Sequence, residues 1–226
     1  MLALVMAGGR GTRLRPLSDV IPKPLLPVRD RPVLEWILFW LEAAGVEETV
    51  VVAGYLSERI QAYLAARPRS SMRVRCYVEE EPLGTAGAIG RLHPLTDPFL
   101  VVNGDVLTTA SIRDLLAAHQ AKGAMITLGT RRLCYRVQSG VLRQGPAGVV
   151  AYDEKPTISW EIAAGVYVLG ARVQDFTPVG AFDMPALVMA ALARGCSVQT
   201  HELEGYWMDI GVPEQYAAGA RDFPGL

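Results

Sequence analysis

The chain has few cysteines, and their number and spacing exclude two kinds of protein. Cys76, Cys134 and Cys196 form no CxxC pair and are odd in number. A disulfide framework uses an even set of cysteines, and a structural zinc site uses closely spaced pairs, so neither is expected. Reduced thiols are typical of a reducing compartment, and we expect a cytoplasmic protein.

The chain also lacks a charge excess and a long apolar run. It carries 22 basic and 23 acidic residues, which gives a net charge of −1. Nucleic acids and anionic membranes are bound through a large basic excess, so neither partner is expected. The apolar N-terminus is interrupted at Gly8, Gly9 and Arg10, too early for a signal peptide or a membrane span. No repeat or low-complexity tract divides the chain, and we expect a single domain over residues 1–226.

What the chain does have is an alternation of expected strands and helices. Apolar runs at 2–6, 49–53 and 73–78 predict strands, and the segments between them, 32–44 and 57–66, have helical spacing. This order predicts an α/β fold with a doubly wound, mostly parallel but mixed central sheet of Rossmann-like architecture. Later in the chain we expect strands at 99–102, 124–129, 161–169 and 197–201, a hairpin over 135–152, and helices at 109–122, 182–194 and 213–221.

The loop after the first expected strand has the composition of a phosphate-binding loop. Glycines let backbone N–H groups converge on an anion, a hydroxyl adds a donor, and guanidinium groups match phosphate oxygens. A lysine between two prolines adds a point charge on a stiff tether. These residues are Gly8, Gly9, Gly11, Thr12, Arg13, Arg15 and Lys23. The loop has neither the GxxxxGK[ST] of a P-loop nor the GxGxxG of a dinucleotide-binding turn, so both classes are excluded.

Five motifs, in order along the chain, resemble those of the sugar-1-phosphate nucleotidylyltransferases. They are GGRGTRLRPLS with PKPLLPV, EEPLGTAGA, NGD, EKP and GYWMDIG. Enzymes of this family join a nucleoside triphosphate (NTP) and a sugar 1-phosphate into a nucleotide sugar and release pyrophosphate. The resemblance implies the family's nucleotidyltransferase fold over the whole chain, Mg²⁺ as cofactor, and an NTP and a sugar 1-phosphate as partners. Within the family, the chain resembles the mannose- and heptose-1-phosphate guanylyltransferases.

The resemblance assigns the nucleotide to the glycine loop and to two later segments. Glu79, Gly84 and Thr85 are expected to face the base. A carboxylate at Glu79 can accept hydrogen bonds from both N1–H and the 2-amino group of guanine, whereas uracil or thymine offers one ring N–H. GTP is therefore favoured, with a uridylyl- or thymidylyltransferase as the alternative. Gly84 and Thr85 also predict a turn and an N-cap before a short helix with free N–H groups. The other expected nucleotide-binding residues are Ala7, Gly8, Gly9, Gly11, Thr12, Arg13, Lys23, Asn103, Gly104 and Asp105.

Asp105 and Asp209 are the expected metal ligands. Asp105 follows the expected strand 99–102, at the sheet edge where the glycine loop lies, and its carboxylate is suited to hold Mg²⁺ against phosphate oxygens. On its own, Asn103-Gly104-Asp105 is equally typical of a type I′ hairpin turn. The resemblance adds Asp209, in GYWMDIG, as the second carboxylate.

The sugar side is assigned by resemblance alone. Glu154 is expected to face the sugar hydroxyls, Lys155 the sugar phosphate, and Gly140 and Gly165 to approach the sugar. One position departs from the family pattern, because Ala163 stands where the family usually has asparagine. The loss of that polar contact keeps open a non-catalytic protein that binds a nucleotide sugar.

The expected reaction needs no nucleophilic side chain. A sugar phosphate has a second pKa of about 6 and is therefore largely dianionic at neutral pH. Arg13 is expected to stabilise charge on the departing pyrophosphate, and Lys23 to hold the α-phosphate. These two are the expected catalytic residues, in a monomer or a homodimer.

Overall fold

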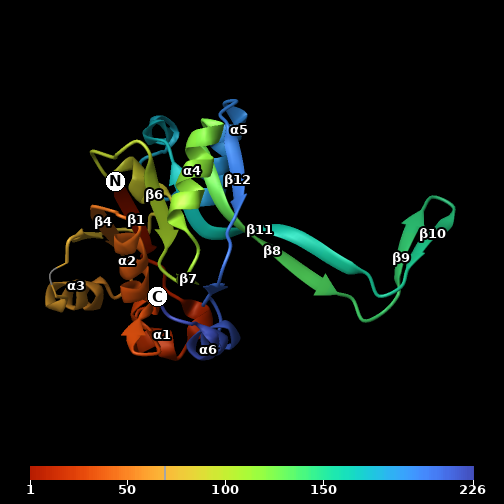
Figure 1. Cartoon of the computed structure of the whole chain (residues 1–226), viewed down its shortest axis with the longest axis horizontal. Helices are drawn as coiled ribbons and strands as arrows, with labels where there is room; N and C mark the ends of the chain where they lie inside the picture. The colour runs from red at the N-terminus through yellow and green to blue at the C-terminus, as the bar shows by residue number, and fades with distance from the viewer. Residues whose placement is uncertain (69) are drawn as a thin grey trace.

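The computed structural model describes residues 1–68 and 70–226, and its centre is a seven-stranded sheet of order β12-β8-β11-β6-β1-β4-β5 (Figure 1). β1 (Leu2–Ala7) pairs in parallel with β6 (Phe99–Asn103) and with β4 (Glu48–Ala53). β4 pairs in parallel with β5 (Arg73–Val78). The parallel part of the predicted sheet is confirmed.

The other half of the sheet is mixed. β11 (Thr157–Leu169) runs antiparallel to both β6 and β8 (Ile126–Arg136), and β12 (Val198–Glu202) runs parallel to β8. β8 continues seven residues beyond the expected end at 129. The extended part of β8 and its partner in β11 leave the body of the molecule together as a pair of strands.

Helices cover both faces of the sheet, as predicted for a doubly wound fold. Alternate residues of β1 enter two separate cores and are almost completely buried, which explains its uninterrupted apolar run. One core includes side chains of α2 (Val33–Ala43), α3 (Ser57–Ala66) and α4 (Ile112–Lys122). The other includes α5 (Met184–Ala193). Short elements complete the fold: α1 (Leu17–Val20), β2 (Pro27–Val28), β3 (Arg31–Pro32), β7 (Val106–Thr108), β13 (Trp207–Asp209), α6 (Pro213–Asp222), and the 3₁₀ turns η1 (Thr12–Leu14), η2 (Lys23–Leu25), η3 (Gly87–Gly90) and η4 (Ala171–Phe176).

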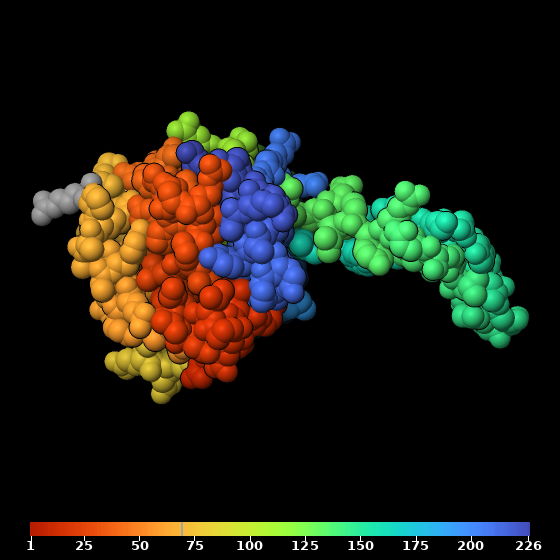
Figure 2. All heavy atoms as spheres, turned by 90° about the horizontal axis from the view of Figure 1, so that it is seen from below, coloured from red at the N-terminus to blue at the C-terminus, as the bar shows by residue number. Residues whose placement is uncertain are grey.

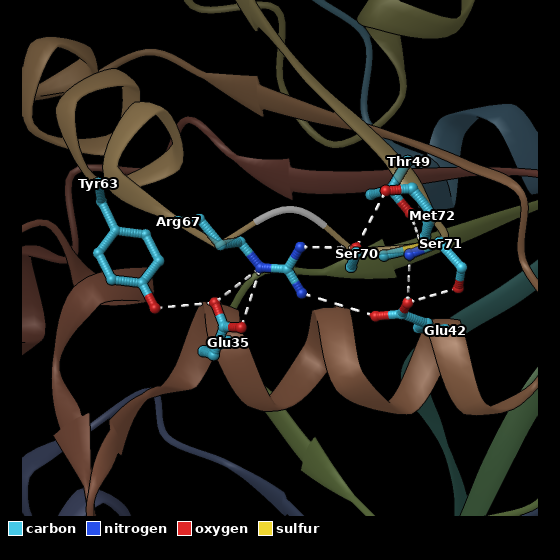
Figure 3. Close-up of polar contacts among 8 residues, drawn as sticks. All are labelled: Glu35, Glu42, Thr49, Tyr63, Arg67, Ser70, Ser71 and Met72. Atoms are coloured by element: carbon cyan, nitrogen blue, oxygen red, sulfur yellow. Dashed lines mark hydrogen bonds and ion pairs between the residues drawn. The ribbon is translucent and has the colours of Figure 1, made fainter.

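A buried ion-pair network fixes α2 to the segment that follows α3 (Figure 3). Arg67 Nε donates to Glu35 Oε1 at 2.9 Å, and Tyr63 Oη donates to Glu35 Oε2 at 2.8 Å. The side chains of Arg67 and Glu35 are only 8% and 11% exposed. Removing one partner would leave a charge buried without compensation, so this network should be sensitive to substitution.

β8 and β11 leave the body as a two-stranded arm that projects from one side of the molecule (Figures 1 and 2). At its far end, β9 (Val141–Gly145) and β10 (Gly148–Asp153) pair only with each other. The predicted hairpin is therefore confirmed at its turn, but it is shorter than expected because residues 135–136 belong to β8. Residues 131–162 are termed the arm below. Among the described helices, none is both long enough and apolar enough to cross a membrane.

Candidate active site

The glycine loop after β1 forms one wall of a cavity of about 230 Å³. Gly11 has φ +59°, a left-handed conformation that glycine adopts without strain, and it is the N-cap residue directly before η1. The cavity is lined by Met6, Ala7, Gly9, Gly11, Thr12, Arg13, Lys23, Pro24, Gly104, Asp105 and Gly211. Backbone, hydroxyl, guanidinium and ammonium donors therefore surround a space beyond the carboxyl ends of the parallel strands.

Asp105 and Asp209 meet at this cavity, although they are far apart in sequence. β7 and β13 pair antiparallel with Asp209 opposite Val106, and Ile210 N–H donates to the Asp105 carbonyl at 3.1 Å. β7 does not pair with β6, so the hairpin-turn interpretation of residues 103–105 is wrong. The short β7–β13 ladder is what brings the two carboxylates together.

Lys23 lies between the two carboxylates. Its ammonium pairs with Asp105 Oδ2 and lies 3.8 Å from Asp209 Oδ1. Burial raises the pKa of Asp209, and the Asp105 carboxylate raises it further, while Lys23 and Arg13 lower it. The cavity thus holds two repelling acids whose charge Lys23 and Arg13 balance only in part.

These residues fit a divalent cation. The Oδ1 atoms of Asp105 and Asp209 are buried and have no hydrogen-bond partner among the described residues. Buried oxygens are normally satisfied, and carboxylate oxygens are ligands that Mg²⁺ prefers. Within residues 1–68 and 70–226, no group of three or more His, Cys, Asp or Glu residues forms a metal cage. Most ligands of such an ion would therefore be water and phosphate oxygens, which is the usual arrangement for Mg²⁺.

A larger cavity of about 480 Å³ adjoins the first and shares Met6, Gly9 and Asp105 with it. The Glu79 carboxylate lies so close to Gly8 that a side chain at position 8 would collide with it. Burial raises the pKa of Glu79, while a hydrogen bond from the Leu83 backbone lowers it. The lining includes the predicted residues Gly8, Glu79, Gly84, Thr85 and Asn103.

The predicted N-cap role of Thr85 is wrong. The short helix is the 3₁₀ turn η3, which has no side-chain cap. Thr85 Oγ1 instead accepts a hydrogen bond from Met184 N–H, at the start of α5, at 2.7 Å. The next two N–H groups both donate to the Phe182 carbonyl at 2.9 Å, so they are not free for a ligand. Thr85 therefore ties the cavity wall to a helix about 100 residues further along the chain.

The predicted sugar-side residues fall into two groups. Gly165 lies against Asn103, since a Cβ on Gly165 would be 2.8 Å from Asn103 Nδ2. Gly140, Glu154 and Lys155 lie at the far end of the arm and line neither cavity. Because a strand advances about 3.3 Å per residue, the arm end near residue 157 is on the order of 25 Å from Gly165. The structure does not bring these three residues to the glycine loop of the same chain.

Arg10, one of the cations expected near a phosphate, lines the larger cavity, whereas sequence reasoning missed three other lining residues: Gly54, Tyr55 and Gly211. Gly54 and Tyr55 directly follow β4, at the same sheet edge as the glycine loop. The rule that ligands lie beyond the carboxyl ends of parallel strands was a sufficient signal for them.

The model of the nucleotidyl transferase family matches residues 2–224, almost the whole chain. The chain belongs to the nucleotidyl transferase family. A family relative, a mannose-1-phosphate guanyltransferase of Schizosaccharomyces pombe, is 33% identical over 229 residues, which cover 97% of this chain and 63% of that protein. The mannose-1-phosphate guanylyltransferase catalytic subunit beta of Danio rerio is 31% identical over 228 residues, with 97% and 63% covered. The chain thus spans about 63% of the length of these relatives.

Solved structures with the same fold extend the comparison. The crystal structure of HddC from Yersinia pseudotuberculosis complexed with GMP-PN aligns with a TM-score of 0.77, covers 98% of this chain and 99% of that one, and is 24% identical. This likeness, at low identity, is evidence for the fold. The predicted α/β class with a mixed, mostly parallel Rossmann-like sheet is confirmed.

Proposed function

We propose that this nucleotidyl transferase moves a guanylyl group from GTP to mannose 1-phosphate or a closely related sugar 1-phosphate, and releases pyrophosphate. The observation that carries the proposal is the convergence of Asp105, Asp209 and Lys23 on the glycine loop, beside a cavity that contains Glu79. The guanyltransferase names of the relatives and the GMP-PN bound to HddC support guanine as the base. We further propose that residues 1–226 act as one catalytic domain in the cytoplasm, supported by the family match over 2–224 and three free cysteines.

The base is selected by Glu79. Its carboxylate faces the larger cavity, and it can accept hydrogen bonds from both N1–H and the 2-amino group of guanine. Two bonds to one carboxylate favour guanine over uracil or thymine, each of which offers one ring N–H. Partial burial strengthens these bonds because water competes less for the carboxylate.

The phosphates are held by the glycine loop, Arg13 and Lys23, all of which line the smaller cavity. Arg13 stabilises the negative charge that builds on the departing pyrophosphate, and Lys23 holds the α-phosphate. The Lys23 ammonium is paired with Asp105 in the structure, so it is already located where phosphate and carboxylate oxygens would meet.

Asp105 and Asp209 are the residues that would hold Mg²⁺. When bound there, Mg²⁺ supplies a Lewis acid that polarises phosphate oxygens. The two carboxylates also orient Lys23 between them, so that its charge is directed into the cavity.

The bond changes follow directly from this arrangement. An oxygen of the dianionic sugar phosphate attacks the α-phosphorus of GTP, and the bond from that phosphorus to the bridging β-phosphate oxygen breaks. The electron pair leaves with pyrophosphate, and no enzyme side chain becomes covalently attached. Electrostatic stabilisation and in-line positioning are therefore the whole contribution of the protein.

The deciding experiment measures pyrophosphate release from GTP, UTP, dTTP, CTP and ATP, each with a panel of sugar 1-phosphates and Mg²⁺. We expect GTP with mannose 1-phosphate or a similar sugar to give the highest kcat/KM. Faster turnover with UTP or dTTP would move the assignment to a uridylyl- or thymidylyltransferase. Binding of a nucleotide sugar without release from any pair would instead identify a non-catalytic protein, the possibility raised by Ala163.

A further inference from the structure

The stem of the arm, where residues 131–136 of β8 pair with residues 157–162 of β11, has one apolar face and one polar face. Trp160 lies opposite Leu133, and Ile158 lies opposite Tyr135. Directly opposed residues of an antiparallel pair point to the same side, so these four side chains form one surface. They are between 37% and 59% exposed, although side chains of this size are normally buried.

The apolar character continues to the tip. Leu142 lies opposite Tyr152, and Val149 and Val150 follow at the turn, all between 50% and 67% exposed. A two-stranded ribbon is at best marginally stable alone in water, and an exposed apolar face such as that of the stem marks an interaction site. Covering the four stem side chains removes on the order of 400 Å² from solvent on each copy, about half of what each partner buries in a typical specific interface, and the exposed apolar side chains of the tip hairpin add to this area.

At the junction between the tip hairpin and the stem, Lys155 has its backbone in a left-handed conformation. Lys155 has φ +44°, in the left-handed region that a non-glycine residue rarely adopts. The neighbouring Glu154 accepts a hydrogen bond from Tyr152 Oη at 2.9 Å and lies 3.7 Å from Lys155 Nζ. The Lys155 side chain is 51% exposed and lines neither cavity of its own chain. Along the extended strand β11, Lys155 lies on the order of 25 Å from the two cavities of its own chain, which together are termed the cleft.

The root of the arm, where β8 and β11 leave the body near Arg131 and Ile162, adjoins this cleft. Gly165, near the start of the arm on β11, lies against Asn103 in the lining of the larger cavity. On β8, Arg131 Nη1 donates to the Leu203 and Gly205 carbonyls, in the segment that leads to Asp209. A ligand or protein segment that covers the root therefore lies next to the site.

We propose that the apolar face of the arm packs against the same face of a second copy of this chain, and that the tip of each arm completes the active site of the other copy. The same surface on both copies is self-complementary across a twofold axis. When two arms of equal length pack face to face and antiparallel, the tip of each lies over the root of the other. Lys155 then adds a cation to the sugar-phosphate end of the partner's cleft. This part of the inference rests on the proposed function; the pairing of the arms does not.

The first test measures the oligomeric state by analytical ultracentrifugation. We expect the wild type to be a dimer at micromolar concentration and the Leu133→Lys/Trp160→Lys double variant to be a monomer, with the dimer Kd raised at least 100-fold. Ser159→Lys is the matched control because Ser159 lies on the polar face of the same ribbon. It should remain a dimer. A monomeric wild type, or a double variant that still dimerises with wild-type affinity, would overturn the proposal.

The second test mixes two defective chains, Asp105→Asn with an intact arm and Lys155→Ala with an intact cleft. Each alone should have low pyrophosphate release. Random pairing makes half of the dimers mixed, each with one complete site, so the mixture should recover about a quarter of wild-type activity. No recovery from two dimeric variants would show that Lys155 acts within its own chain and contradict the proposal, as would full activity of Lys155→Ala. If the wild type releases no pyrophosphate with any substrate pair, the proposed function fails, while ultracentrifugation still decides whether the arms pair.

Discussion

The cleft and the arm are built from contacts of very different range. In the cleft, Lys23 pairs with Asp105 across 82 positions of sequence, and Asp209 joins them from near the C-terminus. In the arm, each residue pairs with one that follows within about 30 positions, and the tip hairpin pairs only with itself. The cleft therefore depends on the whole core, whereas the arm depends on local pairing and, in our account, on a second chain.

The two regions also differ in how deeply their apolar side chains and ion pairs are buried. Large apolar side chains such as Leu38 and Phe99 are fully buried in the body, while Tyr152 and Trp160 are about half exposed on the arm. The Arg67–Glu35 pair of the body is 8% and 11% exposed, whereas the Arg143–Asp153 pair of the arm is 66% and 42% exposed. Substitutions in the body should consequently have large effects on catalysis or stability, and substitutions of arm ion pairs small ones.

The largest effect is expected for Asp105→Asn in the cleft. Loss of one carboxylate leaves the expected cation poorly held, and kcat should fall on the order of 10² to 10³-fold, the scale of removing one transition-state contact. Steady-state pyrophosphate release with saturating GTP and sugar 1-phosphate measures this. Asp175→Asn, an exposed carboxylate on η4, is the matched control and should keep wild-type kcat. Undiminished Mg²⁺-dependent turnover of Asp105→Asn would show that Asp105 is not part of the active site.

The next effect concerns the buried ion pair of the body. Glu35→Gln removes the nearer of the two carboxylates that pair with Arg67 and leaves only Glu42, at 3.7 Å, to balance the buried guanidinium, so the free energy of unfolding should fall by about 3 kcal/mol. Urea denaturation followed by circular dichroism gives this value. Glu58→Gln, exposed on α3, should change it very little. Equal stability of the two variants would mean that the network in Figure 3 does not support the fold.

A smaller effect is expected for base selection by Glu79. Glu79→Gln should lower the preference for GTP over UTP by about 10- to 100-fold in kcat/KM, because a neutral amide cannot accept both guanine donors. Burial raises the pKa of Glu79 above its ordinary value of 4.5, so the carboxylate becomes protonated at a higher pH than a free glutamate. The KM for GTP should therefore rise as the pH falls toward that raised pKa, and this rise should be absent in the variant. Identical pH profiles would exclude Glu79 as the base-binding group.

The smallest effect is expected for the exposed ion pair of the arm. Asp153→Asn breaks the contact with Arg143, which spans 3.2 Å at a solvated site. Such pairs contribute little, so the free energy of unfolding should change by less than about 0.5 kcal/mol. A loss similar to that of Glu35→Gln would show that the arm ion pair stabilises the chain as much as the buried one does, and the contrast between the regions would be wrong.

The sequence was sufficient to predict the strands and the glycine loop of the body, because the signals for them are local and strong. The buried run before Gly8 and the glycines and cations after it predict a strand and an anion-binding loop from neighbouring residues alone. The cap at Thr85 could not be predicted, since its partner Met184 lies 99 positions away. Nothing in the local pattern identifies a donor that arrives from another element.

The arm could not be predicted for a different reason. Leu133 and Tyr135 alternate with Arg132 and Arg136, which is a strand pattern, but this short segment lies beyond the strand predicted over 124–129 and only partly within the hairpin predicted over 135–152. Sequence pattern also cannot show that the hairpin extends away from the cleft. The placement of Lys155 far from its own glycine loop emerges only from the pairing of β8 with β11.

The central claim is that Asp105 and Asp209 together hold one divalent ion, and direct counting of bound Mn²⁺ by electron paramagnetic resonance tests it without any assay of turnover. We expect one competing site per wild-type chain that Mg²⁺ displaces, and an affinity at least about tenfold weaker in both Asp105→Asn and Asp209→Asn. Wild-type Mn²⁺ affinity in either variant would contradict the account.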